Sequence, residues 1–155
     1  MSFKFYIGID PDIKKSGFAV WDAQYQKFEY ITSLSFWDMY STLSDLFMDH
    51  NIYVVIDAGW LRKKSNFHNR KGQTKQAGEK IAEYVGRNHQ IGILIQEYCK
   101  NVGIPYELNI PSGKINAEAF KNITKYTEIT NQDQRDAAML VFQRKNIKLY
   151  EKSHT

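Results

Sequence analysis

The sequence predicts an α/β domain built on a five-stranded mixed sheet, with a three-stranded antiparallel meander, two parallel strands and flanking helices. Three short apolar runs follow one another near the start of the chain, separated by polar turns, which is typical of a meander. Two later apolar runs each follow a segment with apolar residues at helical spacing, which favours parallel strands. The 155 residues are 43% apolar, enough for one core. We therefore expect one domain over residues 1–150 and a frayed tail over residues 151–155.

The first half of the chain is predicted to hold four strands and one helix. The strands are expected at residues 3–9, 17–22, 28–31 and 53–56. Ser35 precedes apolar residues at helical spacing, so we expect it to cap a helix that ends near His50. The first and fourth strands are apolar but are each followed or ended by a carboxylate, Asp10 and Asp57. A carboxylate at such a position is costly unless a cation or hydrogen-bond donors meet it.

The second half of the chain begins with a basic loop over residues 58–78 that contains no acidic residue. A long amphipathic helix, a strand interrupted early by Pro105 and two shorter helices are expected to follow it. Their ranges are 76–100, 104–110, 117–123 and 133–146. Asn131 and Thr130 are the candidate caps of the last helix.

The overall composition narrows the classes of function. A formal net charge of +4 and an isoelectric point near 9.0 are compatible with nucleic-acid binding without requiring it. No apolar run approaches the roughly 20 residues of a membrane-spanning helix, and no signal segment is visible, so we expect a cytoplasmic protein with no membrane partner. Cys99, the single cysteine, falls on an apolar helical stripe, which favours core packing over a nucleophilic role.

Two acids in the last predicted helix continue its apolar stripe. Asp133 and Asp136 share a helical face with the apolar residues that follow them. These apolar residues are Ala137, Leu140 and Val141. If they face the sheet, the two acids face it as well, at the N-terminal end of the helix. An alternative explanation is that the acids only favour the positive end of the helix dipole, and it leaves Asp10 and Asp57 unexplained.

Four aspartates are therefore expected to converge at one edge of the sheet. Neighbouring parallel strands end at the same edge, which would place Asp10 beside Asp57, with Asp133 and Asp136 against them. Clustered carboxylates repel one another unless multivalent cations neutralise them. Ligand sets made only of oxygen favour Mg²⁺ or Mn²⁺ over zinc. Two such ions about 3.5–4 Å apart suit in-line displacement at phosphorus, so the sequence predicts a two-metal hydrolytic site.

Three stretches of the chain resemble the RuvC-type Holliday junction resolvases of the RNase H-like superfamily. They are IGIDPDIKKSGFAV, VVIDAGW and NQDQRDAAMLV. The resemblance covers nearly the whole chain and implies an RNase H-like fold with Asp10, Asp57, Asp133 and Asp136 as ligands of two Mg²⁺ ions. It also implies a homodimer that cuts branched DNA, leaves 5′-phosphate and 3′-hydroxyl ends and needs no small-molecule cofactor. Position 57 is commonly Glu in the cellular enzymes, and the compact chain is more similar to phage or prophage versions, which act in a bacterial or phage-infected cell.

The resemblance extends to further residues. Lys114 matches a lysine near the scissile phosphate and joins the four aspartates as a catalytic candidate, with Lys121 as a weaker one. Trp60 falls where the family often has an aromatic residue that enters the junction. A structural explanation stays open for each, because either lysine can be a solvated helix residue and Trp60 can anchor its loop. Asn88 can face DNA or be a satisfied buried amide, which we favour, and Asp12 is expected to be a turn residue.

The basic loop is a candidate path for the DNA backbone. Together with Lys114 and Lys121, the residues expected to contact DNA are Trp60, Arg62, Lys63, Lys64, Phe67, Arg70 and Lys71. Lysines and arginines with interleaved aromatic residues suit a phosphate path with bases stacked beside it. The alternative is an ordinary solvated loop. His68 and His89 lack metal-ligand spacing and are expected to be surface residues.

Rival functions use the same residues differently. Another RNase H-like nuclease would share the carboxylates and cut RNA/DNA hybrids or flaps, and a non-catalytic nucleic-acid-binding module would share only the fold. Symmetric cutting of a junction needs two active sites related by a twofold axis. We therefore expect a homodimer, with the helix over residues 76–100 as its contact.

Overall fold

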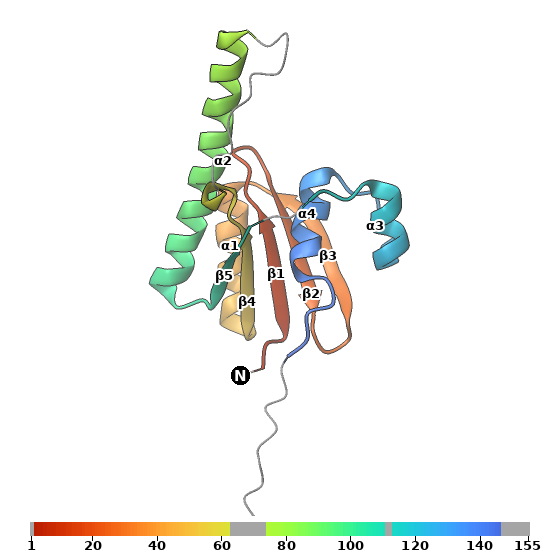
Figure 1. The fold of residues 1–155 in the computed structure, drawn as a ribbon. Coiled ribbons are helices and arrows are strands. Elements are labelled where there is room, and N and C mark those ends of the chain that lie inside the picture. Colours follow the sequence, from red (N-terminus) through yellow and green to blue (C-terminus); the bar gives the residue numbers. More distant parts are fainter. Residues whose placement is uncertain (1, 63–73, 111–112, 147–155) are drawn as a thin grey trace, which may run out of the picture.

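A five-stranded mixed sheet forms the centre of the protein (Figure 1). The computed structural model describes residues 2–62, 74–110 and 113–146. The strands are β1 (Phe5–Asp10), β2 (Ser16–Asp22), β3 (Lys27–Leu34), β4 (Ile52–Asp57) and β5 (Tyr106–Asn109). Their order is β3-β2-β1-β4-β5; β1 pairs antiparallel with β2 and parallel with β4, and β5 pairs parallel with β4. The predicted meander and parallel pair are therefore confirmed.

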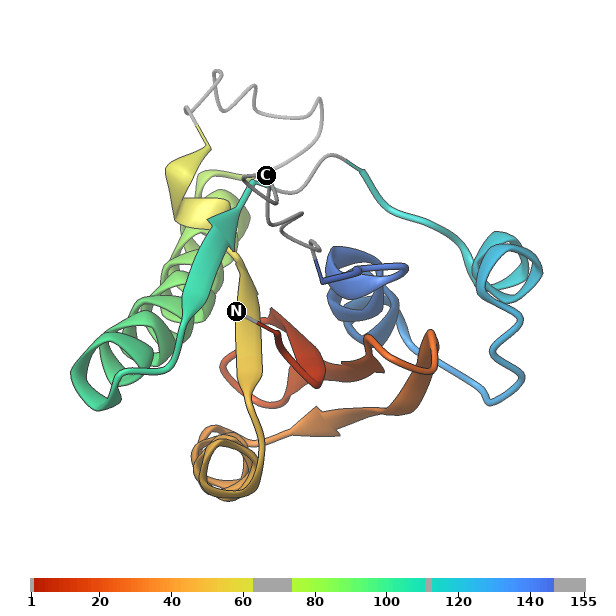
Figure 2. The ribbon, with the colours of Figure 1, turned by 90° about the horizontal axis from the view of Figure 1, so that it is seen from below.

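Helices cover both faces of this sheet (Figure 2). The helices are α1 (Phe36–Asp49), α2 (Lys75–Val102), α3 (Ala117–Thr124) and α4 (Gln132–Val141), with a short 3₁₀ helix η1 (Gly59–Leu61). α1 and α2 lie on one face, while α4 lies on the other and α3 lies beyond α4, away from the sheet. Ser35 caps α1 as expected, because its Oγ accepts a hydrogen bond from the Asp38 amide at 3.3 Å.

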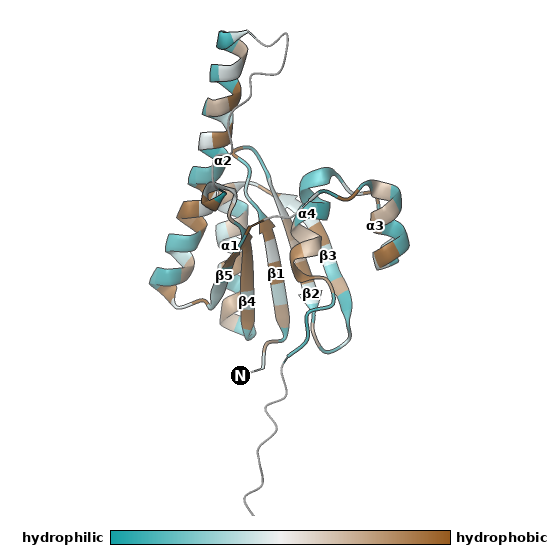
Figure 3. Ribbon diagram, in the orientation of Figure 1, coloured by the Kyte–Doolittle hydropathy of each residue, from teal (hydrophilic) through white to brown (hydrophobic). Residues whose placement is uncertain are grey.

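Each face of the sheet has its own hydrophobic core. Successive residues of a strand point to opposite faces, so Ile7 and Ile9 pack toward α1 and α2, whereas Tyr6 packs toward α4. Along α4, hydropathy changes from a hydrophilic first turn to a hydrophobic later part, as Figure 3 shows. Cys99 is fully buried in the first core, and burial raises the pKa of its thiol to about 12. The expected packing role of Cys99 agrees with this position.

The last helix is shorter than the predicted range 133–146. It ends at Val141, and Gln143 adopts a left-handed φ of 62°. The Arg144 carbonyl then accepts hydrogen bonds from Trp21 Nε1 at 3.0 Å and from Gln26 Nε2 at 2.9 Å. Side chains of β2 and of the turn after it thus replace the next helical turn and hold the chain against the sheet.

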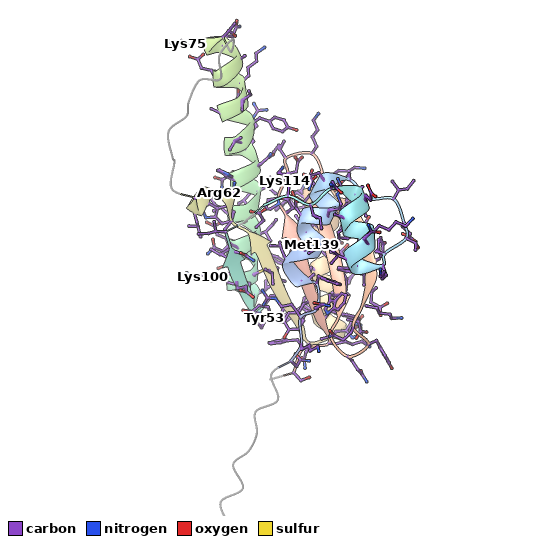
Figure 4. All side chains as sticks on the ribbon, turned by 45° about the vertical axis from the view of Figure 1, so that its right-hand side comes forward. Tyr53, Arg62, Lys75, Lys100, Lys114 and Met139 are labelled. Atoms are coloured by element: carbon purple, nitrogen blue, oxygen red, sulfur yellow. The ribbon has the colours of Figure 1, made fainter. Side chains whose placement is uncertain are left out.

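The long helix starts earlier than predicted and ends later. Thr74 Oγ1 accepts a hydrogen bond from the Ala77 amide at 3.1 Å and caps α2, while Gly103 ends the helix at a φ of 83°. The end of the predicted loop 58–78 is therefore helical. The first half of α2 projects beyond the sheet, with Lys75 at its far end (Figure 4). In the described parts of the chain, no helix combines the length and apolarity needed to cross a membrane.

Among the strands, β5 and β3 differ most in length from their predicted ranges. β5 is shorter than 104–110, because Ile104 turns into the first core, where it is 2% exposed, and Pro105 has no amide hydrogen for the sheet. β3 is longer than 28–31 because its pairing with β2 continues to Leu34. Neither difference moves the strands that end on Asp10 and Asp57.

Candidate metal centre

Asp10 and Asp57 lie side by side at one edge of the sheet. β1 and β4 are adjacent parallel strands, with Ile9 paired to Ile56 just before the two acids. The C-terminal ends of both strands therefore deliver a carboxylate to the same place, as the sequence predicted. Both side chains are half-buried.

α4 brings the two remaining acids to this edge. Carboxylate oxygens of Asp10, Asp133 and Asp136 all lie within 4.8 Å of one another, the spacing of a shared cation. Asp57 is outside this group of three but lies near it, since its charge, after burial, raises the pKa of Asp10. The predicted convergence of four aspartates is thus present, with three forming the tighter group.

The carboxylates raise one another's pKa values. Burial, followed by the charges of Asp57, Asp133 and Asp136, raises the pKa of Asp10 to about 8. Burial also raises the pKa of Asp57 to about 6, although the nearby Arg62 lowers it. The pKa of Asp133 is raised by burial and by the charge of Asp12. The site is therefore short of positive charge, the condition that a bound multivalent cation relieves.

Two glycines allow α4 to approach the sheet closely. A Cβ atom at Gly8 would lie 2.0 Å from the Ala137 carbonyl oxygen, and one at Gly17 would lie 2.0 Å from the Asp133 carbonyl oxygen. Gly17 pairs with Asp10 across β1 and β2, so its missing side chain is what lets Asp133 reach Asp10. Sequence reasoning missed this role of both glycines. The available signal was a glycine inside each strand, which often marks close backbone approach.

Lys114 is the predicted catalytic lysine that the structure brings to the acids. Its Nζ lies 3.9 Å from Asp136 Oδ2, although its side chain is 75% exposed. Arg62 lies near Asp57, whose pKa its charge lowers. Figure 4 shows Lys114 and Arg62 at the same end of the molecule, near the C-terminal ends of the strands. Lys121 is exposed in the last turn of α3, so its predicted DNA contact would lie apart from the metal centre.

The loop between β1 and β2 is fixed by its own residues and by α2. Asp12 Oδ1 accepts a hydrogen bond from the Lys14 amide at 2.8 Å, as expected of a turn residue. After burial, the charge of Asp12 also raises the pKa of Asp133, so this turn residue lies close to the aspartates. Asn88 Oδ1 accepts a hydrogen bond from the Ile13 amide at 2.8 Å. The amide oxygen of Asn88 is therefore satisfied, as favoured, but its side chain is half-buried and not fully buried.

Trp60 packs between the metal-centre edge and α2. A Cβ atom at Gly92 would lie 2.4 Å from Trp60 Cζ3, and the Trp60 and His89 rings meet edge to face at 6.4 Å. This packing corresponds to the loop-anchor alternative, and contact of Trp60 with DNA stays a prediction. His89 is half-buried rather than a free surface residue, and burial lowers its pKa. Of the residues discussed from the sequence, those outside the described parts of the chain are Lys63, Lys64, Phe67, His68, Arg70 and Lys71.

Comparisons with known proteins define the class of fold. No protein-family model matches the chain, and no curated protein matches its sequence significantly. The strand order, the flanking helices and one match to a solved structure, described next, make this an RNase H-like α/β fold.

The particular likeness is to RuvC. The structure of T. thermophilus RuvC in complex with a Holliday junction substrate matches with a TM-score of 0.52 at 12% identity, over 90% of each chain. A further Thermus thermophilus RuvC structure matches with a TM-score of 0.48 at 14% identity, over 90% of this chain and 92% of that one. The shared fold agrees with the fold that the sequence motifs implied.

Proposed function

We propose that this protein is a metal-dependent endonuclease that cuts branched DNA, with the four-way junction as its preferred substrate. The observation that carries the proposal is the group of Asp10, Asp133 and Asp136, whose oxygens lie within 4.8 Å of one another. Asp57 and Lys114 complete this centre from two further segments of the chain. The RuvC neighbour was solved with a Holliday junction, which supports the choice of substrate.

The aspartates are suited to hold hard divalent cations. Asp10, Asp133 and Asp136 would hold one Mg²⁺ ion, and Asp57 with Asp10 would contribute to a second, with Mn²⁺ as an alternative metal. When bound, such ions lower the pKa of a water molecule and stabilise the oxygen that leaves the phosphorus. The protein itself orients the carboxylates on rigid elements, since Asp10 and Asp57 end strands and Asp133 and Asp136 start a helix.

Lys114 and the basic residues would bind the phosphate backbone. The Lys114 ammonium beside Asp136 is placed to offset negative charge that develops at the scissile phosphate. Arg62, on the Asp57 side, and the basic residues predicted from the sequence between positions 63 and 71 would add positive charge for binding the DNA backbone. Binding should therefore weaken steeply as salt concentration rises.

Cleavage assays on four substrates test this function. Wild type and Asp136→Asn are compared on a synthetic four-way junction, a flap, an RNA/DNA hybrid and plain duplex DNA, with and without Mg²⁺. Loss of a residue that hydrogen-bonds to a metal ligand typically lowers activity about 10–100-fold. Loss of a metal ligand itself should lower it further. Asp38→Asn is the control, because it makes the same change at an exposed helical aspartate, in the first turn of α1 on the opposite face of the sheet.

The outcomes separate the rival functions. Mg²⁺-dependent cutting of the junction that Asp136→Asn abolishes and Asp38→Asn keeps supports the proposal. Cutting of the hybrid or the flap alone would replace it by another nuclease activity on this fold. Tight junction binding with no cleavage under any metal condition would point to a non-catalytic binding module.

A homodimer through α2 is part of the proposal. The projecting half of α2 carries apolar side chains that remain uncovered in the single chain, with exposed fractions of 52% for Ile81, 40% for Tyr84 and 38% for Val85. These residues continue the helical stripe that Ile91 and Ile95 bury against the sheet. Ile81→Asp should convert the dimer to a monomer in sedimentation velocity, whereas Lys80→Asp, one residue away, should not. A wild-type protein that is monomeric at all concentrations would contradict the dimer.

A further inference from the structure

A buried arginine connects the first turn of α4 to the linker between β5 and α3. Arg135 is 9% exposed and lies between the two acids of α4 in sequence. Its Nε donates to the Ile115 carbonyl at 3.1 Å, and its Nη1 donates to the Thr130 carbonyl at 2.6 Å. Its Nη2 donates to Gln132 Oε1 at 3.2 Å. One guanidinium therefore joins the backbone at Ile115 and at Thr130 to the side chain of Gln132.

Gln132 continues this connection to the metal centre itself. Its Nε2 donates to Asp136 Oδ1 at 2.7 Å and to the Ile115 carbonyl at 3.3 Å. The Ile115 carbonyl is thus held by both Arg135 and Gln132, one residue after Lys114. Lys114 meets the other oxygen of Asp136, Oδ2, at 3.9 Å. Gln132 therefore orients Oδ1 of Asp136, and Lys114 lies beside Oδ2. We call the contacts of Arg135 and Gln132 the Arg135–Gln132 clip.

Stability alone does not explain a buried guanidinium at this position. The hydrogen-bond partners given above for Arg135 are neutral carbonyl and amide oxygens, so no carboxylate among them offsets the cost of burying its charge. An apolar side chain of similar volume fills such a space at a lower cost in desolvation. An apolar side chain, however, lacks the rigid, planar guanidinium group, whose several N–H donors fix the positions of several acceptors at once. The contacts therefore indicate an orienting role.

We propose that Arg135 and Gln132 are positioning residues that hold the backbone at Ile115 and thereby fix Lys114 against Asp136. The linker would otherwise be free to carry the exposed Lys114 side chain away from the acids. This inference rests on the proposed function for its kinetic consequence, because Lys114 there stabilises charge at the scissile phosphate. Its structural consequence, a fixed linker, is independent of any activity.

A double-mutant cycle with Lys114 tests the kinetic consequence. Arg135→Lys keeps the positive charge but removes the planar guanidinium group. Loss of such a supporting residue around a metal site should lower the junction cleavage rate about 10–100-fold. In the Lys114→Ala background the same change should have little further effect, because the group that the clip positions is already gone. A merely structural role of Arg135 would instead lower the rate by the same factor in both backgrounds, and that result would overturn the proposal.

A matched pair of glutamine variants provides a second test in case Arg135→Lys fails to fold. Gln132→Met removes the clip from the first turn of α4. Gln134→Met makes the same change in the same turn but removes only the capping box with Asn131 and a contact to Ser33. The proposal requires coupling to Lys114→Ala for Gln132→Met and none for Gln134→Met. Equal behaviour of the two glutamine variants would overturn it.

Limited trypsin digestion tests the fixed linker without DNA or metal. Trypsin cuts after lysine, and cleavage after Lys114 should be slow while the clip holds the linker and faster once it is lost. Mass spectrometry should show accelerated cutting at Lys114 in Arg135→Lys and Gln132→Met, with no change in Gln134→Met. If the wild type cuts no nucleic acid yet digestion follows this pattern, the proposed function fails and the clip stands. Unchanged digestion in folded clip variants would overturn the clip itself.

Discussion

One face of the sheet carries two polar clusters, and they differ in how their charge is compensated. At the C-terminal ends of the strands, Asp10, Asp57, Asp133 and Asp136 face one another with Lys114 and Arg62 at their margin. At the opposite ends of the same strands, a second cluster surrounds one acid. Its members are Tyr6, Tyr53, Glu107, Arg144 and Asn146.

The second cluster is balanced within the chain. Glu107 forms an ion pair with Arg144, and the Arg144 guanidinium lies 5.9 Å from the centre of the Tyr6 ring. The Tyr6 hydroxyl donates to Asn146 Oδ1 at 3.0 Å, while Asn146 Nδ2 donates to the Phe3 carbonyl at 2.8 Å. Here one acid meets one base, so the cluster fastens the end of the chain to the sheet. The aspartate cluster has more acids than bases, and this excess of negative charge is what the proposed metal ions would neutralise.

The largest difference between the clusters should appear in catalysis. Asp10→Asn and Glu107→Gln each replace one carboxylate on this face by an amide of the same shape. Asp10→Asn should lower Mg²⁺-dependent junction cleavage by more than the roughly 100-fold typical of an outer metal partner, because a direct ligand is lost. Glu107→Gln should leave the rate unchanged under saturating Mg²⁺. Cleavage rates are measured at equal concentrations of folded protein. An equal loss of rate in both variants would contradict a special role of the aspartate cluster in catalysis.

The pH dependence of stability should come from the aspartate cluster. The pKa of Asp10 is raised in the folded protein to about 8 and that of Asp57 to about 6. Between the ordinary pKa of an aspartate, about 3.9, and these values, the folded state binds more protons than the unfolded state. The metal-free protein should therefore lose stability as pH rises from about 4 to about 8.

Thermal unfolding in EDTA at pH 5 and pH 8 measures this effect. The melting temperature should be lower at pH 8, and Asp10→Asn should reduce the difference. Mg²⁺ at about 100 times its Kd should add about 2.7 kcal/mol at pH 8. A melting temperature that rises with pH in EDTA would show that the acids are compensated in some other way.

The close contact of α4 with the sheet should be sensitive to one methyl group. Gly17→Ala places a Cβ atom where the Asp133 carbonyl oxygen lies, 2.0 Å from an ideal Cβ position. Overpacking of this kind typically costs about 1–3 kcal/mol. We expect a lower melting temperature together with weaker Mg²⁺ stabilisation, since Asp133 is displaced from Asp10.

Gly78→Ala provides the control for Gly17→Ala. A Cβ atom at Gly78 would meet nothing within 4 Å, and Gly78 lies in the projecting half of α2. An alanine in a helix is about 1 kcal/mol more favourable than a glycine, so this variant should be slightly stabilised. Unimpaired Mg²⁺ binding in Gly17→Ala would show that α4 can shift without opening the aspartate cluster.

The smallest expected effect is the stability change at the balanced cluster. The Glu107 and Arg144 side chains are 36% and 31% exposed, so solvent screens much of their attraction. Glu107→Gln should lower stability by less than about 1 kcal/mol, which corresponds to a melting temperature about 2–4 °C lower at most. Calorimetry in EDTA compares it with Asp10→Asn, which should raise the melting temperature at pH 8. The same sign in both variants would contradict the contrast between the clusters.

The strands, the order of elements and the identity of the four aspartates could be predicted because each left a local pattern. Apolar runs that end on Asp10 and Asp57 are visible in a single stretch, as are Asp133 and Asp136 on an apolar helical stripe. The end of the last helix could not be predicted, because side chains more than 100 residues earlier, Trp21 and Gln26, bind the Arg144 carbonyl. Helix propensity depends on neighbouring residues only, so it cannot predict a contact between residues this far apart in the sequence.

The sequence by itself determined which residue types could form a metal centre and which ends of the strands would carry them. The tertiary structure alone decided how closely they meet. The glycines at positions 8 and 17 let α4 rest directly on the sheet, and the contacts of Arg135 and Gln132 carry Lys114 to Asp136. The physical reason is that periodicity encodes which face a side chain points to, whereas distances between elements depend on packing between residues that are far apart in the chain.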